Sequence, residues 1–260
     1  MDCQLRKGGT MKTKYALVVL AALLLVPCAA FAQAAKVVDV GGHVTVKADA
    51  SADWKKAKVN MVLNKDAEIE TKENSYCTLA FDEEQKNIVT LKQNSRIRID
   101  SIKPGAVYLP QGRVFSLIKN LSKSEKFEVR TPTAIAGARG TGWITEFHGG
   151  CVSQKCLDDV TYVQGLDPQG NITGEASLPQ GNGMDVCGGG QLGTRYALGE
   201  NDYNEWNDFT GYVGGLSGGG DDGSGDDGFG DDRDDQREDA REEDAQERRQ
   251  HQVSGSYEKR

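Results

Sequence analysis

Apolar and polar residues alternate in short runs through the middle of the chain. Arg96-Ile97-Arg98-Ile99-Asp100 alternates at every position, and Arg113–Ile118, Phe127–Arg130 and Trp143–Phe147 follow the same period of two. This period predicts β-strands with one face packed and the other in water. Ile88-Val89-Thr90-Leu91 is almost continuously apolar, which predicts a buried strand.

These runs recur at intervals of roughly ten residues, a rhythm typical of all-β architectures. Asn-Ser, Pro-Gly and Gln-Gly pairs separate them, and helical periodicity is nearly absent before Gly199. We therefore expect residues 36–199 to form one all-β domain, a solenoid-like or roll-like stack of short strands. About 160 residues suffice to bury a single core, and no second folded domain is expected.

The segment 200–216 changes the pattern. Tyr203, Trp206, Phe209 and Tyr212 follow one another at intervals of three, which places them on one side of a helical turn. We interpret this segment as one that docks on the β domain through its aromatic side chains. The alternative is an exposed aromatic patch that binds a partner.

Residues 1–32 have the features of a secretory signal peptide whose start is Met11. Lys12 and Lys14 precede an uncharged apolar run from Tyr15 to Val26, and Ala30-Phe31-Ala32 offers the small residues that signal peptidase requires. The run is shorter than the roughly 20 residues that span a bilayer. Cleavage before Gln33 and export to the periplasm or cell envelope are therefore expected, with the membrane contacted only through the signal. An uncleaved anchor and a lipoprotein attached through Cys28 are the alternatives.

The net charge of −8 resides in the C-terminal tail. Residues 217–260 hold fifteen acidic and seven basic side chains, whereas the rest of the chain is balanced. Residues 214–232 are glycine and aspartate with almost nothing apolar, which predicts disorder because burial cannot offset the entropy of ordering. Arginines and acids interleaved after residue 233 favour a solvated, partly helical end. A balanced β domain without a basic stripe argues against nucleic acid as a partner.

Four cysteines follow the predicted cleavage site: Cys77, Cys151, Cys156 and Cys187. An even number in an exported chain favours disulfides. Four cysteines allow three pairings, of which we favour a local Cys151–Cys156 bridge with Cys77–Cys187 as a long-range bridge. A zinc site would require closer cysteine pairs or histidines at suitable spacing, so no metal ligands are assigned.

The most distinctive motif runs from Phe127 to Trp143. Thr131-Pro132 ends a strand, a small-residue crossing follows, and Gly137, Arg139, Gly140, Thr141 and Gly142 lead into the next strand. The glycines permit close backbone approach and positive φ, and Arg139 carries enough donors to hold several carbonyls of a bend. We interpret the motif as structural; binding of an anion by Arg139 in a glycine nest is the alternative.

This motif resembles the FecR domain, which is found in the periplasmic parts of ferric-citrate-type signalling regulators and in stand-alone exported proteins. Trp54, the segment from Leu63 to Ser75, and the turns Asn94–Ile97 and Gln111–Val114 extend the resemblance from about Val37 to Phe147. The resemblance implies a solenoid-like or roll-like β stack with a protein-binding or signalling role. A sigma regulator of the family also has a cytoplasmic helical domain, for which Met1–Thr10 leave no room, so transmembrane signalling is not expected.

No enzyme signature emerges from the sequence, and neither a catalytic residue nor a cofactor is assigned. The glycine runs lack the lysine and the strand–helix context of a phosphate loop. His148 near Cys151 is the one pair that suggests a hydrolase. We therefore expect a non-enzymatic envelope binding or scaffold protein, whose partner is an envelope protein or a cell-wall glycan. The alternative is a calcium-responsive surface protein acting through the Asp/Gly tail, whose run from Asp221 to Gly228 loosely resembles glycine-aspartate calcium repeats.

Overall fold

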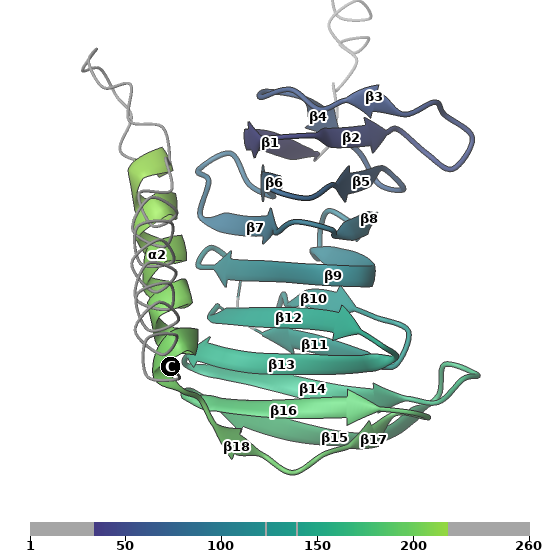
Figure 1. Ribbon diagram of the computed structural model, residues 1–260, viewed down its shortest axis with the longest axis vertical. Helices are drawn as coiled ribbons and strands as arrows, with labels where there is room; N and C mark the ends of the chain where they lie inside the picture. The colour runs from purple at the N-terminus through teal and green to yellow at the C-terminus, as the bar shows by residue number, and fades with distance from the viewer. Residues whose placement is uncertain (1–33, 123, 139, 218–260) are drawn as a thin grey trace, which may run out of the picture. The chain divides into compact units, whose positions relative to one another are not determined.

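The computed structural model describes residues 34–122, 124–138 and 140–217. Within these ranges the chain folds into two β-sheets that face each other, with one α-helix along the outside (Figure 1). The all-β, stacked fold predicted from the alternation is confirmed. The predicted signal peptide and the acidic tail lie outside the described residues, except for residue 217, which ends the helix.

The two sheets are antiparallel apart from one parallel pair, β9 with β10, and they share the long strand β9. In spatial order, sheet A contains β4 (Val62–Leu63), β1 (Ala35–Gly41), β6 (Tyr76–Ala80), β7 (Asn87–Leu91), β9 (Ala106–Ile118), β12 (Gly142–His148), β13 (Cys151–Asp158) and β16 (Asn182–Cys187), the last paired with β17 (Gln191–Leu192) and β18 (Tyr196–Ala197). Sheet B contains β3 (Lys55–Lys56), β2 (Val44–Lys47), β5 (Glu68–Thr71), β8 (Arg96–Ser101), β9, β10 (Phe127–Arg130), β11 (Ala134–Ala138), β14 (Val160–Leu166) and β15 (Ile172–Pro179).

Positive-φ residues let the chain turn from one sheet into the other. Strand β9 makes such a crossing at Gly112, whose φ is +95° and which lies directly against Ser95. Asn94, with φ 55°, makes the neighbouring crossing from β7 to β8. A side chain at Gly112 would collide with Ser95, so the Gln-Gly turn of the sequence marks a close approach of two successive crossings.

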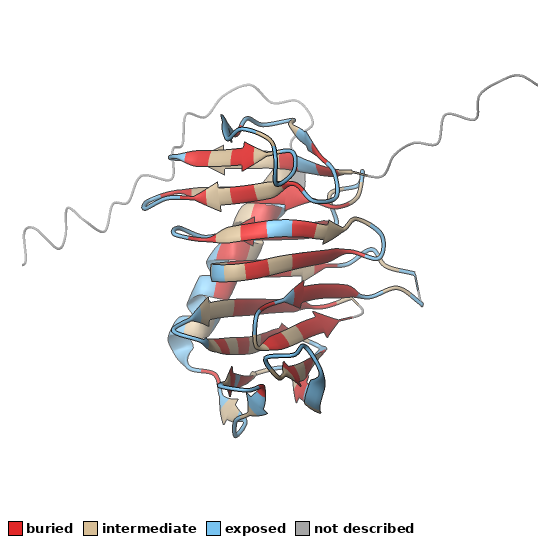
Figure 2. Cartoon of the chain, turned by 90° about the vertical axis from the view of Figure 1, so that its right-hand side faces the viewer, coloured by how far each residue is buried: buried red, intermediate tan, exposed pale blue. Residues whose placement is uncertain are grey.

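The core lies between the sheets. Its inward side chains come from every second position of the strands, among them Val89 and Leu91 of β7 and Ile97 and Ile99 of β8, all fully buried. Figure 2 shows the same alternation of buried and more exposed positions along successive strands. This period-two pattern is what a strand with one packed face requires.

Helix α2 (Glu200–Ser217) covers the outer face of sheet A. Trp206, Phe209 and Val213 are buried there against Phe115 and Ile144. Tyr203, predicted on the same side, remains 38% exposed. Within the described ranges, no helix is both long and apolar enough to cross a membrane.

Candidate interaction face

The outer face of sheet B is the uncovered side of the β-sandwich among the described residues. Helix α2 runs along the other side (Figure 1). The outward positions of sheet B carry charged and aromatic side chains in place of the apolar ones found under the helix. They are Lys47, Trp54, Glu68, Glu70, Arg96, Arg98, Asp100, Tyr108, Glu128, Arg130 and Tyr162, and together we call them the open face.

Trp54 lies at the upper part of the open face, over β2 and β8. It is 39% exposed. The Lys47 ammonium lies 5.1 Å and the Arg96 guanidinium 5.6 Å from its ring centroid. Both cations also form ion pairs, Lys47 with Glu68 at 3.0 Å and Arg96 with Glu70 at 2.6 Å. Two cations over one indole fix the ring in place while leaving much of it accessible.

Arg98 and Tyr108 lie in the middle of the open face, on the neighbouring strands β8 and β9. The guanidinium of Arg98 is 5.0 Å from the centroid of the Tyr108 ring and 2.9 Å from a carboxylate oxygen of Asp100. The Arg98 side chain is 44% exposed. Arginine and tyrosine presented in this way are typical of residues that dominate protein interfaces.

Glu128 anchors the lower part of the open face. Its carboxylate is almost fully buried, accepts a hydrogen bond of 2.7 Å from the Tyr162 hydroxyl, and pairs with Lys126 and, at 2.6 Å, with Arg130. Burial alone would raise the pKa of Glu128, but the hydrogen bonds from Lys126, Tyr162 and Arg130 hold that pKa below its usual range. Burial and the bond to Glu128 both raise the pKa of Tyr162. Glu128 is therefore a charged anchor that orients Arg130 and Tyr162.

The FecR-like motif connects the open face with the helix-covered face. The Thr131 hydroxyl donates to the carbonyl of Ala134 at 2.9 Å and accepts the Ala134 amide at 3.0 Å, which closes the turn around Pro132. Thr141 is buried, and its carbonyl accepts the Ile118 amide at 2.9 Å.

The motif glycines make room for aromatic rings on both faces. A side chain at Gly137 would collide with Tyr162 on the open face, and one at Gly142 would collide with Trp206 of α2. Gly140 turns the chain with φ +103°. The structural interpretation of the motif stays a prediction. Arg139 lies outside the described residues, so anion binding there remains a prediction.

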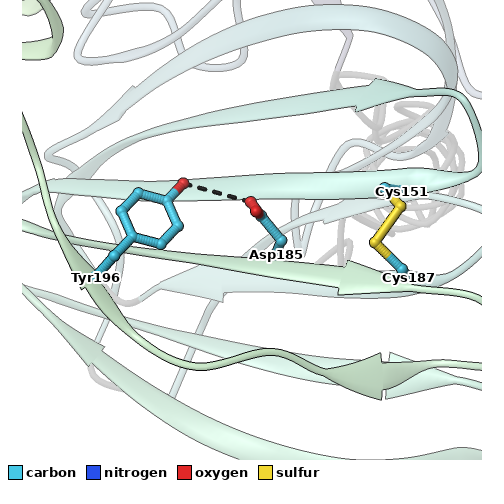
Figure 3. Close-up of a disulfide and its surroundings, with 4 residues drawn as sticks. All are labelled: Cys151, Asp185, Cys187 and Tyr196. Atoms are coloured by element: carbon cyan, nitrogen blue, oxygen red, sulfur yellow. Dashed lines mark hydrogen bonds between the residues drawn. A yellow bond between two sulfur atoms is a disulfide. The ribbon is translucent and has the colours of Figure 1, made fainter.

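The disulfide differs from the favoured pairing. Cys151 bonds to Cys187, with their Cα atoms 4.2 Å apart (Figure 3), whereas Cys77 and Cys156 are free and buried. The Cys151–Cys156 prediction is wrong because both residues lie on β13, where five residues span about 17 Å, too far for a disulfide. The Cys77–Cys187 prediction is wrong because Cys77 points into the core, where burial raises its pKa to about 12.

The pairing of strands explains why Cys151 finds Cys187. Val152 of β13 lies opposite Val186 of β16 in an antiparallel ladder. Cys151, the residue before Val152, therefore lies opposite Cys187, the residue after Val186. The bond also removes Cys151 as a nucleophile for His148, its cross-strand neighbour on β12. Within the described ranges, no three His, Cys, Asp or Glu side chains come together in a way that could hold a metal ion.

A second candidate surface is a groove at the edge of the sandwich, beside β1 and β7. Phe81 and Phe127 form its floor and meet edge to face at 5.0 Å, while Glu83 and Lys103 line its rim. Asn87 also lines the groove, but its side chain already bonds the backbone of Lys119 and Asn120. The polar groups of Asn87 are therefore engaged in holding the fold.

Sequence reasoning predicted the strands Arg96–Asp100 and Phe127–Arg130 of the open face, and their alternation placed the arginines outward. It predicted no strand at β5 or β14. Tyr162 gave no signal, because its contact with Glu128 joins β14 to β10 across 34 residues.

Comparison with known proteins confirms the resemblance seen in the motif. The family model described as FecR protein matches residues 67–158, from the residue before β5 to the end of β13. No curated protein matches.

Two solved structures resemble the chain weakly. Both are described as a "putative anti-sigma factor" from Parabacteroides distasonis ATCC 8503, at 1.65 and 2.50 Å resolution. Each has a TM-score of 0.44 and 12% identity, and the matches cover 54% of this chain and 64% and 63% of the other. The chain therefore spans less than two thirds of that protein.

Proposed function

We propose that this protein, which carries a FecR domain over residues 67–158, is a non-enzymatic binding or scaffold protein of the periplasm or cell envelope. The FecR match supports a signalling or regulatory role. The observation that carries the proposal is the open face, where Trp54, Arg98, Tyr108 and Arg130 are presented on a rigid sheet with no covering element among the described residues.

The composition of this face favours a protein partner over a glycan. Trp, Tyr and Arg are the residues most enriched among those that dominate protein interfaces. Here cations hold Trp54 and Tyr108, and the Asp100 carboxylate holds Arg98. Preorganised side chains lose less rotamer freedom on binding. Alternating charges such as Arg98 and Asp100 suit a partner surface with charges of both signs.

The test compares the wild-type chain with the triple variant Trp54→Ala, Arg98→Ala, Tyr108→Ala in a pull-down from an envelope extract of the source cells. We expect at least one protein to be retained by the wild type and its recovery to fall at least about tenfold with the variant, since one such residue is commonly worth more than 1 kcal/mol. A matched control, Glu83→Ala with Lys86→Ala, changes exposed residues away from this face and should leave recovery unchanged.

Two results would contradict the proposal. One is retention of the same proteins by wild type and triple variant, which would move the binding surface elsewhere. The other is retention of purified cell-wall glycan with no enriched protein, which would identify a glycan as the partner. Circular dichroism of each variant checks that the β fold is intact.

A further inference from the structure

The most exposed large aliphatic side chains among the described residues lie near the two ends of the stack. Val59 and Val62 lie at the first end, next to the terminal strands β3 and β4, and are 47% and 65% exposed. Val160 and Ile172 lie at the last end, on β14 and β15, and are 45% and 57% exposed. Apolar side chains exposed at both ends of a stack are expected where each end meets another surface.

The first end is basic. Lys55 and Lys56 form β3 and Lys58 follows them, and all three side chains are exposed. None of the three forms an ion pair with another described residue. Asp49 and Asp53 lie in the same loop, so the three ammonium groups leave this end with a small net positive charge.

The last end is acidic. Residues 158–199 contain five acidic side chains and a single basic one, Arg195. Asp159, Asp167 and Glu175 are at the surface around β14 and β15 and form no ion pair within the described part of the chain. The two ends of one stack therefore carry opposite charges.

The strands at the two ends also differ in length. At the first end, both sheets finish in two-residue strands, β3 and β4. At the last end, β16 of sheet A is paired with the two-residue β17 and β18, but sheet B finishes in the eight-residue β15. Within the described residues β15 forms a ladder with β14 alone, so its other edge has no strand partner there, although Gly190 and Leu192 lie against its Thr173–Gly174 end.

We propose that copies of this chain associate head to tail, the β15 end of one copy docking on the β3 end of the next. The occupant is a second copy because the lysines of the first end complement the acids of the last, and each end carries exposed apolar side chains. Such a contact is heterologous, since different surfaces of the two copies meet. It goes beyond the proposed function and leaves the open face free.

The contact is expected to be weak. A strand of eight residues is about 26 Å long and two sheets lie about 10 Å apart, so the last end offers a contact area of roughly 260 Å². Standard interfaces bury about 800 Å² per partner. Association should therefore be detectable at protein concentrations of about 0.1–1 mM and weaken with salt, which shortens the Debye length from about 30 Å at 0.01 M to 3 Å at 1 M.

Sedimentation velocity on the purified full chain tests this with two charge-reversed variants. The first carries Lys55→Glu, Lys56→Glu and Lys58→Glu, so both of its ends are acidic. The second carries Asp159→Lys, Asp167→Lys and Glu175→Lys, so both of its ends are basic. We expect the wild type to assemble with concentration, each variant alone to associate at least tenfold more weakly, and an equimolar mixture of the two to regain association.

The single variants distinguish head-to-tail docking from a symmetric contact between like ends, because a symmetric contact uses one kind of end, and the variant that keeps that end unchanged would then associate as the wild type does. A wild type that stays monomeric at about 1 mM and low salt would overturn the proposal, and so would variants that associate as the wild type does. Assembly that occurs only after residues 218–260 are removed would overturn it for the full chain. Lys86→Glu, an exposed reversal away from both ends, is the control and should leave association unchanged. Loss of association in these variants with envelope pull-down intact would leave the proposed function standing.

Discussion

The two outer faces of the sandwich are built from the same kind of alternating strands. Helix α2 covers the outer face of sheet A, whereas no described element covers the outer face of sheet B. On sheet A, the outward positions Ile88, Phe115 and Ile144 are apolar and lie under α2. On sheet B, the outward positions Arg96, Arg98 and Asp100 of β8 are charged and uncovered. The outward residue of each strand, rather than the strand pattern itself, therefore determines which face is closed and which is open.

Helix α2 joins the strands of sheet A across most of the stack. Its first turn holds β13 through Asp202 and Lys155 at 2.6 Å, and its last turns hold β1 through Tyr212 and Asp39 at 2.6 Å. An 18-residue helix is about 27 Å long, which spans five to six strands spaced about 4.8 Å apart. Sheet A is thus stabilised by the helix, and sheet B has its outer side chains free for binding.

The largest expected effect compares two aromatic residues of β9, one on each face. Phe115 is buried against Trp206 and Phe209, whereas Tyr108 is on the open face. Phe115→Ala should lower the free energy of unfolding by about 3–5 kcal/mol, because it leaves a cavity under the helix. Tyr108→Ala should cost less than about 1.5 kcal/mol. Urea unfolding of both variants measures the difference.

Equal losses in Phe115→Ala and Tyr108→Ala would break the comparison, since they would mean that both faces contribute alike to stability. Amide hydrogen exchange provides the control on mechanism. Phe115→Ala should speed exchange in α2 (Glu200–Ser217), and Tyr108→Ala should leave it unchanged.

The second effect concerns the part of sheet A nearest the last end. There the disulfide Cys151–Cys187 joins β13 to β16 and closes a segment with a sequence separation of 36. Replacing both cysteines by alanine should cost about 2–4 kcal/mol, since the unfolded chain regains the freedom that the bond removes. Thermal unfolding with and without reductant measures it, and the reductant should have no effect on the double variant. An unchanged stability would show that the strand pairing alone holds this region.

The difference between the faces was partly predictable. The run Ile88–Leu91 predicts a buried strand because both of its faces are apolar, and it lies in sheet A between the core and α2. The alternating run Arg96–Asp100 predicts one wet face, and it lies in sheet B. Local sequence was sufficient in both cases because the period of side chains along a strand decides their burial.

Contacts between distant strands were not predictable from local sequence. The disulfide depends on the register of β13 against β16, and one residue of slip would turn Cys187 inward. Likewise, a side chain at Gly142 would collide with Trp206, which lies 64 residues further along the chain. The motif shows that a glycine is required there, but the ring it accommodates is known only once the helix is placed.

A smaller effect is expected where the end of α2 meets sheet A. The Tyr76 hydroxyl donates to Asp39 at 3.0 Å, and burial followed by the Asp39 charge raises the pKa of Tyr76 to about 12. A raised folded pKa gives stability that is complete below the unfolded value of about 10 and is lost as the pH rises through 12. Tyr76→Phe should cost about 1 kcal/mol at neutral pH and remove this component of the loss above pH 10.

Urea unfolding between pH 8 and 12 tests this, with the difference between wild type and Tyr76→Phe as the readout. That difference should shrink as the pH rises. The matched control is Tyr108→Phe. It also removes a tyrosine hydroxyl, but from the open face, where that hydroxyl forms no bond with Asp39. A constant difference for Tyr76→Phe would contradict the role of the Asp39 bond.

The smallest effect on stability should come from the open face itself. Arg98→Ala removes one exposed ion pair with Asp100 and one cation–π contact with Tyr108, each worth up to about 1 kcal/mol. Arg113 is the matched arginine of the other face, where it pairs with Glu205 of α2 at 2.5 Å and its side chain is only 21% exposed. Arg113→Ala should therefore cost more than Arg98→Ala in urea unfolding and should leave partner recovery intact. If Arg98→Ala instead destabilises the fold more than Arg113→Ala does, the open face is maintained for stability, and its side chains need no partner to explain them.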